Sequence, residues 1–105
     1  MADRRVVVTG LGMLTPLAPS LDDSWRLMHE GKSGIAPIES FDADGFPVRI
    51  AGEVPEFDIS EYLPPKEARR MDGFIRHGLV AGMQAVQDSG FEVTDENRHR
   101  IGVAV

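Results

Sequence analysis

The sequence contains no cysteine, and this absence excludes two kinds of site. A disulfide framework and a thiolate metal site both need cysteine, so neither can form within these 105 residues. Long apolar runs are also missing, because no stretch approaches the roughly 20 residues that a membrane-spanning helix needs. The basic lead at the N-terminus is too short for a secretory signal, and Gly10 and Gly12 soon interrupt the apolar run that follows it. We therefore expect a cytoplasmic protein.

Positive charge is scarce as well. The chain has 11 basic and 17 acidic residues, for a formal net charge of −6. This balance argues against nucleic acid as a partner, because phosphate binding needs a basic face. The exception lies between Tyr62 and Leu79, where four basic residues outnumber two acidic ones. The four are Lys66, Arg69, Arg70 and Arg76. A basic island on an acidic chain is a reason to consider an acidic partner.

Local signals predict three helices. Ser20 is a suitable N-cap for a helix over 21–30, which Gly31 would stop. Pro64-Pro65 favours a short helix over 66–71. The longest pattern runs over 73–89 and has Gly90 at its end. One face of this long helix carries apolar residues at helical spacing: Ile75, Leu79, Met83 and Val86. Its small residues would let a neighbour pack closely; they are Gly78, Ala81, Gly82 and Ala85.

Three segments are predicted to be strands. They are the β-branched run over 4–9, a weaker candidate over 48–54, and the apolar run over 101–105. The last has no polar alternation, which is typical of a strand buried on both faces of a parallel sheet. With the long helix as a right-handed crossover, the order of elements is that of an α/β protein. Because a buried strand needs neighbours, we expect the chain to be the N-terminal piece of a larger protein.

Several candidate sites are weak. Gly10-x-Gly12 resembles a dinucleotide-binding loop, but Thr15 stands where the third glycine belongs, and Pro16 delays the helix that would hold the pyrophosphate. We therefore favour a tight structural turn and expect no cofactor; the alternative is a nucleotide-binding oxidoreductase. The histidines lack metal-ligand spacing, so no metal site is expected, and we interpret them as surface or helix-side residues. They are His29, His77 and His99. No nucleophile stands out, since Ser33 lacks a phosphate-binding loop before it.

The basic helix is the strongest candidate that the residues alone provide. Lys66, Arg69 and Arg70 stand at positions i, i+3 and i+4, so their side chains leave one face of a helix together. Such a face could bind an acidic partner. On the residues alone we favour the other interpretation, a solvated surface in which Glu67 pairs with Arg70.

Segments along the whole chain resemble one known family, the bacterial β-ketoacyl-acyl-carrier-protein synthases, those of type II most of all. The opening run is Arg4-Arg5-Val6-Val7-Val8-Thr9-Gly10-Leu11-Gly12-Met13-Leu14-Thr15-Pro16-Leu17. Further matches are Trp25, Gly31-Lys32-Ser33-Gly34-Ile35, Phe41-Asp42, the segment from Lys66 to Ile75, Gln84-Ala85, Asp88-Ser89-Gly90 and Arg100-Ile101-Gly102. Thr9-Gly10-x-Gly12 alone would mean little, but together the motifs are highly specific.

The resemblance implies a thiolase-like fold, in which two similar α/β halves stack in layers (α/β/α/β/α), and a homodimer. The chain would then be the first quarter of the synthase, ending inside the first half-domain. The implied reaction is a decarboxylative Claisen condensation, in which an acyl group on a cysteine is attacked by the carbanion of malonyl-acyl-carrier protein. The family's cysteine, two histidines and lysine lie beyond Val105, so we expect no catalytic residue in this chain and no activity from the chain alone. Lys66, Arg69 and Arg70 match the family's positions that dock the acidic acyl carrier protein.

Two alternatives remain beside fatty acid synthesis. A ketosynthase or chain-length factor of a polyketide pathway would share these motifs, and the chain-length factor would lack the cysteine. A short, non-catalytic carrier-binding module would use the same basic helix without any chemistry.

Overall fold

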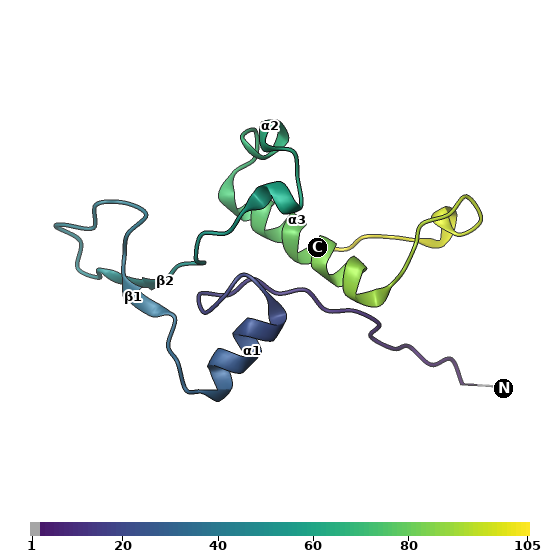
Figure 1. The fold of residues 1–105 in the computed structure, drawn as a ribbon, viewed down its shortest axis with the longest axis horizontal. Helices are drawn as coiled ribbons and strands as arrows, with labels where there is room; N and C mark the ends of the chain where they lie inside the picture. The colour runs from purple at the N-terminus through teal and green to yellow at the C-terminus, as the bar shows by residue number, and fades with distance from the viewer. Residues whose placement is uncertain (1–2) are drawn as a thin grey trace.

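The computed structural model describes residues 3–105, which follow an extended path (Figure 1). The radius of gyration is 17.6 Å, against about 13 Å for a compact domain of this length. In chain order the elements are α1 (Leu21–His29), β1 (Ile35–Pro37), β2 (Ile50–Gly52), the 3-10 helix η1 (Ile59–Glu61), α2 (Pro65–Ala68), α3 (Gly73–Ser89) and the 3-10 helix η2 (Arg98–Arg100). Within the described range no helix is long and apolar enough to cross a membrane.

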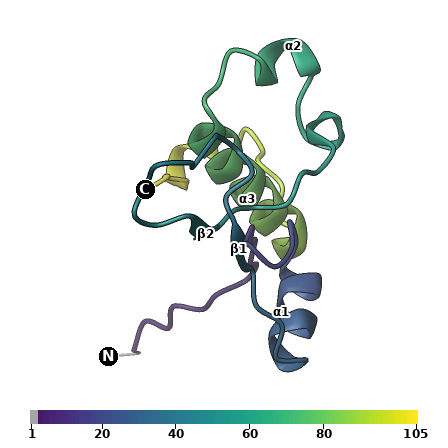
Figure 2. The ribbon, with the colours of Figure 1, turned by 90° about the vertical axis from the view of Figure 1, so that its left-hand side faces the viewer.

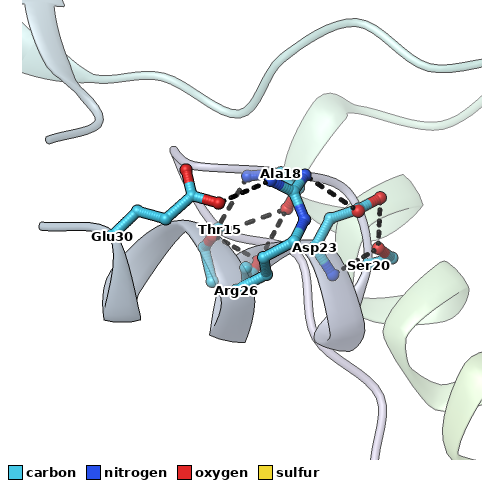
Figure 3. A network of polar contacts seen from close by, with 7 residues as sticks. Thr15, Ala18, Ser20, Asp23, Arg26 and Glu30 are labelled. Atoms are coloured by element: carbon cyan, nitrogen blue, oxygen red, sulfur yellow. Dashed lines mark hydrogen bonds and ion pairs between the residues drawn. The ribbon is translucent and has the colours of Figure 1, made fainter. Parts of the chain in front are cut away.

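Helix α1 begins as predicted and ends one residue earlier than expected, with Glu30 as its C-cap. The Ser20 hydroxyl accepts a hydrogen bond from the backbone N–H of Asp23 at 3.4 Å, which satisfies one of the free donors of the first turn. Arg26 then pairs with Asp23 at 3.3 Å and with Glu30 at 3.1 Å (Figure 3). These ion pairs are exposed, so they contribute little beyond local helix support.

Thr15 organises the turn that leads into α1. Its hydroxyl accepts hydrogen bonds from the backbone N–H groups of Leu17 and Ala18. It also lies 2.7 Å from the hydroxyl of Ser24, which is fully buried and donates to the carbonyl of Ala18 at 3.1 Å. Figure 3 shows this cluster beside the ion pairs of Arg26. The residue that stands in place of a third glycine is thus a structural one.

The sheet formed by the described residues is a two-stranded antiparallel hairpin. Ile35 pairs with Gly52 and Pro37 with Ile50. The strand predicted over 48–54 is therefore confirmed at its centre, but its partner, Ile35–Pro37, was not predicted to be a strand. The strand propensity of β2 can be read from its own residues. The short strand β1 has no such propensity, and it becomes a strand only because it pairs with β2.

Helix α3 spans Gly73–Ser89, as predicted. It ends at Gly90, which has the left-handed backbone conformation (φ 64°). The close packing predicted at the small residues of this helix is confirmed at Ala81 and Ala85, whereas the predicted apolar face stays largely exposed. Val80 is fully buried, whereas Ile75, Leu79 and Val86 remain 38–52% exposed. The small residues Ala81 and Ala85 instead receive the backbone of another segment. The helix therefore packs through its small side chains rather than through its apolar stripe.

Two predicted strands are wrong for the described chain. Residues 4–9 and 101–105 are extended but form no ladder, and Val7 and Val103 are 73% and 89% exposed. The expected parallel crossover through α3 is therefore not formed among residues 3–105. β-branched residues favour extended backbone, but a strand also needs a neighbour whose N–H and C=O groups face it. No other segment of the described chain supplies that neighbour to either run.

Candidate docking surface

Helix α2 and the turn that follows it carry the basic residues that the sequence singled out: Lys66 lies within the helix, and Arg69 and Arg70 come directly after it. Pro65 occupies the first helical position, and the backbone turn continues past the helix through the bond from Met71 N–H to the carbonyl of Ala68. The helix is shorter than predicted, but its neighbouring turns keep the helical spacing of the cations. Ala68 is only 3% exposed, whereas Lys66, Arg69 and Arg70 are exposed. Since Ala68 faces inward, the basic side chains leave the opposite side, and Figure 2 shows α2 at an end of the molecule.

The charges of this basic face are not neutralised. Among residues 3–105, the ion pairs involve Arg26, Arg49 and Arg98, and none involves Lys66, Arg69 or Arg70. The Glu67–Arg70 pair of the alternative interpretation is absent from this set. Three like charges close together on one exposed face raise the local positive potential.

Arg76, the fourth basic residue of the island, has a different environment. It is half-buried, and its Nε donates a hydrogen bond to the carbonyl oxygen of Met71 at 2.9 Å. Met71 lies in the short bend between α2 and α3. The Arg76 guanidinium is thus engaged with the backbone, and we do not count it with the basic face.

The segment before α2 is ordered by its own capping bonds. Asp58 accepts hydrogen bonds from the hydroxyl and the N–H of Ser60 at 2.6 and 3.0 Å, and these bonds, that of the hydroxyl foremost, lower the pKa of its carboxyl group. The N–H of Leu63 donates to the carbonyl of Ile59 at 2.9 Å and closes the turn of η1. The chain therefore enters α2 from a fixed turn.

Gly10 and Gly12 lie against the backbone of α3. A Cβ built on Gly12 would be 1.9 Å from the carbonyl oxygen of Ala81, and one on Gly10 would be 2.2 Å from that of Ala85. The sequence predicted a structural role for these glycines. In the structure that role is to let the chain lie close against the backbone of α3, where a side chain would not fit. This also explains why small residues occupy that face of α3.

Two backbone N–H groups of residues 10–13, which we call the glycine segment, donate hydrogen bonds to side chains of α3. Leu11 donates to the Asp88 carboxylate at 2.9 Å, and Met13 donates to Gln84 Oε1 at 3.0 Å. A dinucleotide-binding loop offers its N–H groups to phosphate, but here these two are already bonded within the protein. This observation counts against the oxidoreductase alternative.

Gln84 was not identified from the sequence. Its Nε2 donates to the carbonyl of Pro19 at 2.8 Å and to the hydroxyl of Tyr62 at 3.2 Å, in addition to the bond from Met13. It therefore connects three distant segments. The only signal in the sequence was a single amide within the small-residue face of a helix, which does not reveal its partners.

The three histidines lie in separate surroundings. His29 packs edge-on against Trp25 with ring centroids 4.7 Å apart, and half-buried His77 lies 6.3 Å from Phe57. His99 is exposed in η2. Over residues 3–105 no group of acidic and histidine side chains could hold a metal ion.

An open groove of about 820 Å³ lies between the hairpin and α3, bordered by Gly34, Glu53 and His77. Glu53 accepts hydrogen bonds from the Ser40 hydroxyl and from the N–H groups of Ser40 and Glu39. These bonds, that of the Ser40 hydroxyl foremost, lower the pKa of Glu53 below its ordinary 4.5. Glu53 thus fastens the loop between β1 and β2.

We expect Glu53→Gln to lower the thermal midpoint at pH 7, because an uncharged amide accepts these bonds less strongly. The pKa of Glu53 is lower in the folded state. Its stabilisation is therefore complete above pH 4.5 and is lost as the pH falls through the lowered pKa. The difference between the two proteins should accordingly shrink below pH 4.5 in thermal denaturation. Exposed Glu56→Gln is the control; a difference that stays constant from pH 7 to pH 3 would contradict the assignment.

Comparison with known proteins gives consistent matches along the chain. The sequence model of the family described as "Beta-ketoacyl synthase, N-terminal domain" matches residues 3–105. Over all 105 residues the chain is 53% identical to 3-oxoacyl-[acyl-carrier-protein] synthase 2 of Vibrio harveyi and 51% identical to that of Vibrio cholerae. It spans only 25% of the length of each relative. Among solved structures, the ishigamide ketosynthase/chain length factor matches 91% of the chain and 23% of its own chain, with a TM-score of 0.73 and 30% identity.

Proposed function

Because this chain belongs to the β-ketoacyl synthase N-terminal domain family, we propose that it is part of a condensing enzyme of fatty acid synthesis. The identity to two 3-oxoacyl-[acyl-carrier-protein] synthases 2 over the full 105 residues supports this assignment. The term parent synthase denotes a protein of the relatives' length that contains these residues. We further propose that the parent synthase is a homodimer.

The proposed reaction of the parent synthase joins two carrier-bound substrates. An acyl group moves from its carrier protein to a cysteine, which releases the carrier thiol and forms an acyl thioester. Malonyl-carrier protein loses CO2, and the electron pair of the broken C–C bond becomes a carbanion. The carbanion attacks the acyl thioester, a C–C bond forms, and the cysteine thiolate leaves. The chain has no cysteine, so the thiolate must come from the remainder of the parent synthase.

The role proposed for this segment is docking of the acyl carrier protein. The observation that carries it is the basic face of α2, where Lys66, Arg69 and Arg70 are exposed without ion pairs among residues 3–105. An acidic carrier protein is complementary to that face. Exposed charges accelerate encounter and fix orientation more than they add affinity. Each is worth on the order of 0.2–1 kcal/mol, because solvent screens it.

Removing the three charges should raise the KM for the carrier-bound substrate. In a parent synthase carrying Lys66→Gln, Arg69→Gln and Arg70→Gln, we expect a rise of about threefold to a hundredfold, the range that three such contacts supply together. The kcat should hardly change, since the charges act before chemistry. Steady-state kinetics with varied carrier-bound substrate measures both constants.

The matched control removes three other exposed cations, Arg4, Lys32 and Arg100, by the same substitution to glutamine. It changes the net charge equally and leaves α2 intact, so its KM should stay near that of the unmodified synthase. Equal KM values for the two triple variants would mean that net charge alone matters, and the proposed docking surface would be abandoned.

One observation favours a second candidate, a ketosynthase or chain-length factor of a polyketide pathway. The solved structure that matches 91% of the chain is described as a ketosynthase/chain length factor. Its identity to the chain is 30%, well below the 53% of the Vibrio harveyi synthase, and we therefore rank fatty acid synthesis first. Docking through α2 is common to both candidates.

A further inference from the structure

The basic helix α2 is too short to hold its own orientation. It has four residues, and an isolated helix of that length is not stable in water. Its direction must therefore be set by contacts with the rest of the protein. Burial of Ala68 fixes which side faces inward. Two hydrogen bonds to α3 then hold the segment on either side of the cations.

The first bond lies upstream of the cations. The hydroxyl of Tyr62 accepts a hydrogen bond from Gln84 Nε2 at 3.2 Å. The orientation of the Gln84 amide is defined by its other partners, because its Oε1 must accept from the N–H of Met13 and its Nε2 must donate to the carbonyl of Pro19. Tyr62 is therefore held by an amide that cannot turn over without losing two further bonds.

The second bond lies downstream. Arg76 Nε donates to the carbonyl of Met71, immediately after Arg70 in the sequence. This donor is specific to arginine, because lysine has a methylene group where arginine has its Nε–H. The bond is therefore removed by Arg76→Lys, while the positive charge remains. The cations of the basic face lie between these two bonds.

We propose that Gln84 and Arg76 are positioning residues for carrier docking, and that they act through Tyr62 and Met71 on the orientation of Lys66, Arg69 and Arg70. This inference rests on the docking function proposed above. In this proposal Gln84 and Arg76 act through other residues and not by contact with the carrier protein. They hold the basic face at one angle to α3, so that an acidic partner meets three charges arranged together. Without either bond the face samples several orientations, and encounter with the partner is less productive.

Tyr62→Phe and Arg76→Lys test the proposal in the parent synthase, because each removes one hydrogen bond and neither changes the net charge. We expect each to raise the KM for carrier-bound substrate about two- to tenfold, the effect of losing one part-buried hydrogen bond. The kcat and the use of a small acyl-thioester mimic without carrier should remain unchanged. Exposed Arg100→Lys is the matched control for Arg76→Lys.

A double-mutant cycle shows whether the effect passes through the cations. When Tyr62→Phe or Arg76→Lys is added to the triple glutamine variant of Lys66, Arg69 and Arg70, we expect no further rise in KM. The same rise in both backgrounds would overturn the proposal, since the two residues would then act independently of the basic face. Faster amide hydrogen exchange over residues 66–71 in both single variants is the expected structural signature.

The outcomes also separate this inference from the docking function. If the triple glutamine variant leaves the KM unchanged, docking through α2 is wrong, and the positioning role falls with it. If that variant raises the KM but Tyr62→Phe and Arg76→Lys do not, docking stands and the positioning role is wrong.

Discussion

The substitution Gly12→Ala should strongly destabilise the chain. The new Cβ would lie 1.9 Å from the carbonyl oxygen of Ala81, 2.8 Å from the N of Ala85 and 2.9 Å from the carbonyl carbon of Ala81. All three are backbone atoms of α3, so no side chain can rotate away. Either the glycine segment or the helix must move, and the bond from Met13 to Gln84 Oε1 would be strained with it. Overpacking typically lowers the free energy of unfolding by about 1–3 kcal/mol, and we expect the loss for Gly12→Ala to lie at or above the upper end of that range.

Gly82→Ala provides a matched control for Gly12→Ala. Gly82 lies on the same helix, but an added Cβ there meets no atom of the described chain within 4 Å. Because alanine is the better helix former, this change should stabilise the chain by about 0.5–1 kcal/mol. Thermal denaturation followed by far-ultraviolet circular dichroism compares the two. Similar midpoints for both variants would show that the glycine segment does not pack on α3 in solution.

Reversing the three charges of the basic face should impair carrier-dependent synthesis more than neutralising them. In the parent synthase, changing Lys66, Arg69 and Arg70 to glutamate replaces attraction of an acidic carrier by repulsion. We expect the KM for carrier-bound substrate to exceed that of the triple glutamine variant. The kcat should change little once the carrier is bound. Steady-state kinetics at several salt concentrations gives both constants.

Salt and substrate choice supply the controls for charge reversal. At high ionic strength the Debye length falls from about 8 Å to about 3 Å, so the defect should shrink. A small acyl-thioester mimic that lacks the carrier should be used equally well by both proteins. The docking surface would be rejected if the triple reversal left carrier-dependent kinetics unchanged, or if the mimic suffered the same loss as the carrier-bound substrate.

The sequence predicted the parts of the fold that depend on neighbouring residues. Ser20 and Gly90 mark helix ends because caps act within one turn, and both were correctly identified. The exposure of Lys66, Arg69 and Arg70 likewise followed from helical spacing. The resemblance to a known family added the proposed role of that surface, which spacing alone had left open.

The parts that were missed depend on contacts between distant segments. The β-branched run over 4–9 has strong local preference but no pairing partner among residues 3–105, so preference alone gave the wrong result. The partner of β2 was missed because Ile35–Pro37 carries no strand signal of its own. Gln84 was missed because its partners lie 22, 65 and 71 positions away in the sequence.

The residues of the basic face are different from the residues that hold α2 in place. Lys66, Arg69 and Arg70 are exposed, and their side chains form no hydrogen bond or ion pair within the described chain, whereas Ala68 beside them is buried. Substitutions at such surface positions usually change stability by about 0.5 kcal/mol or less. Under the proposed docking role, the three positions could therefore vary with the charge pattern of the carrier protein while α2 keeps its place. Carrier preference would then be a property that can be redesigned, or can drift during evolution, with little effect on the fold.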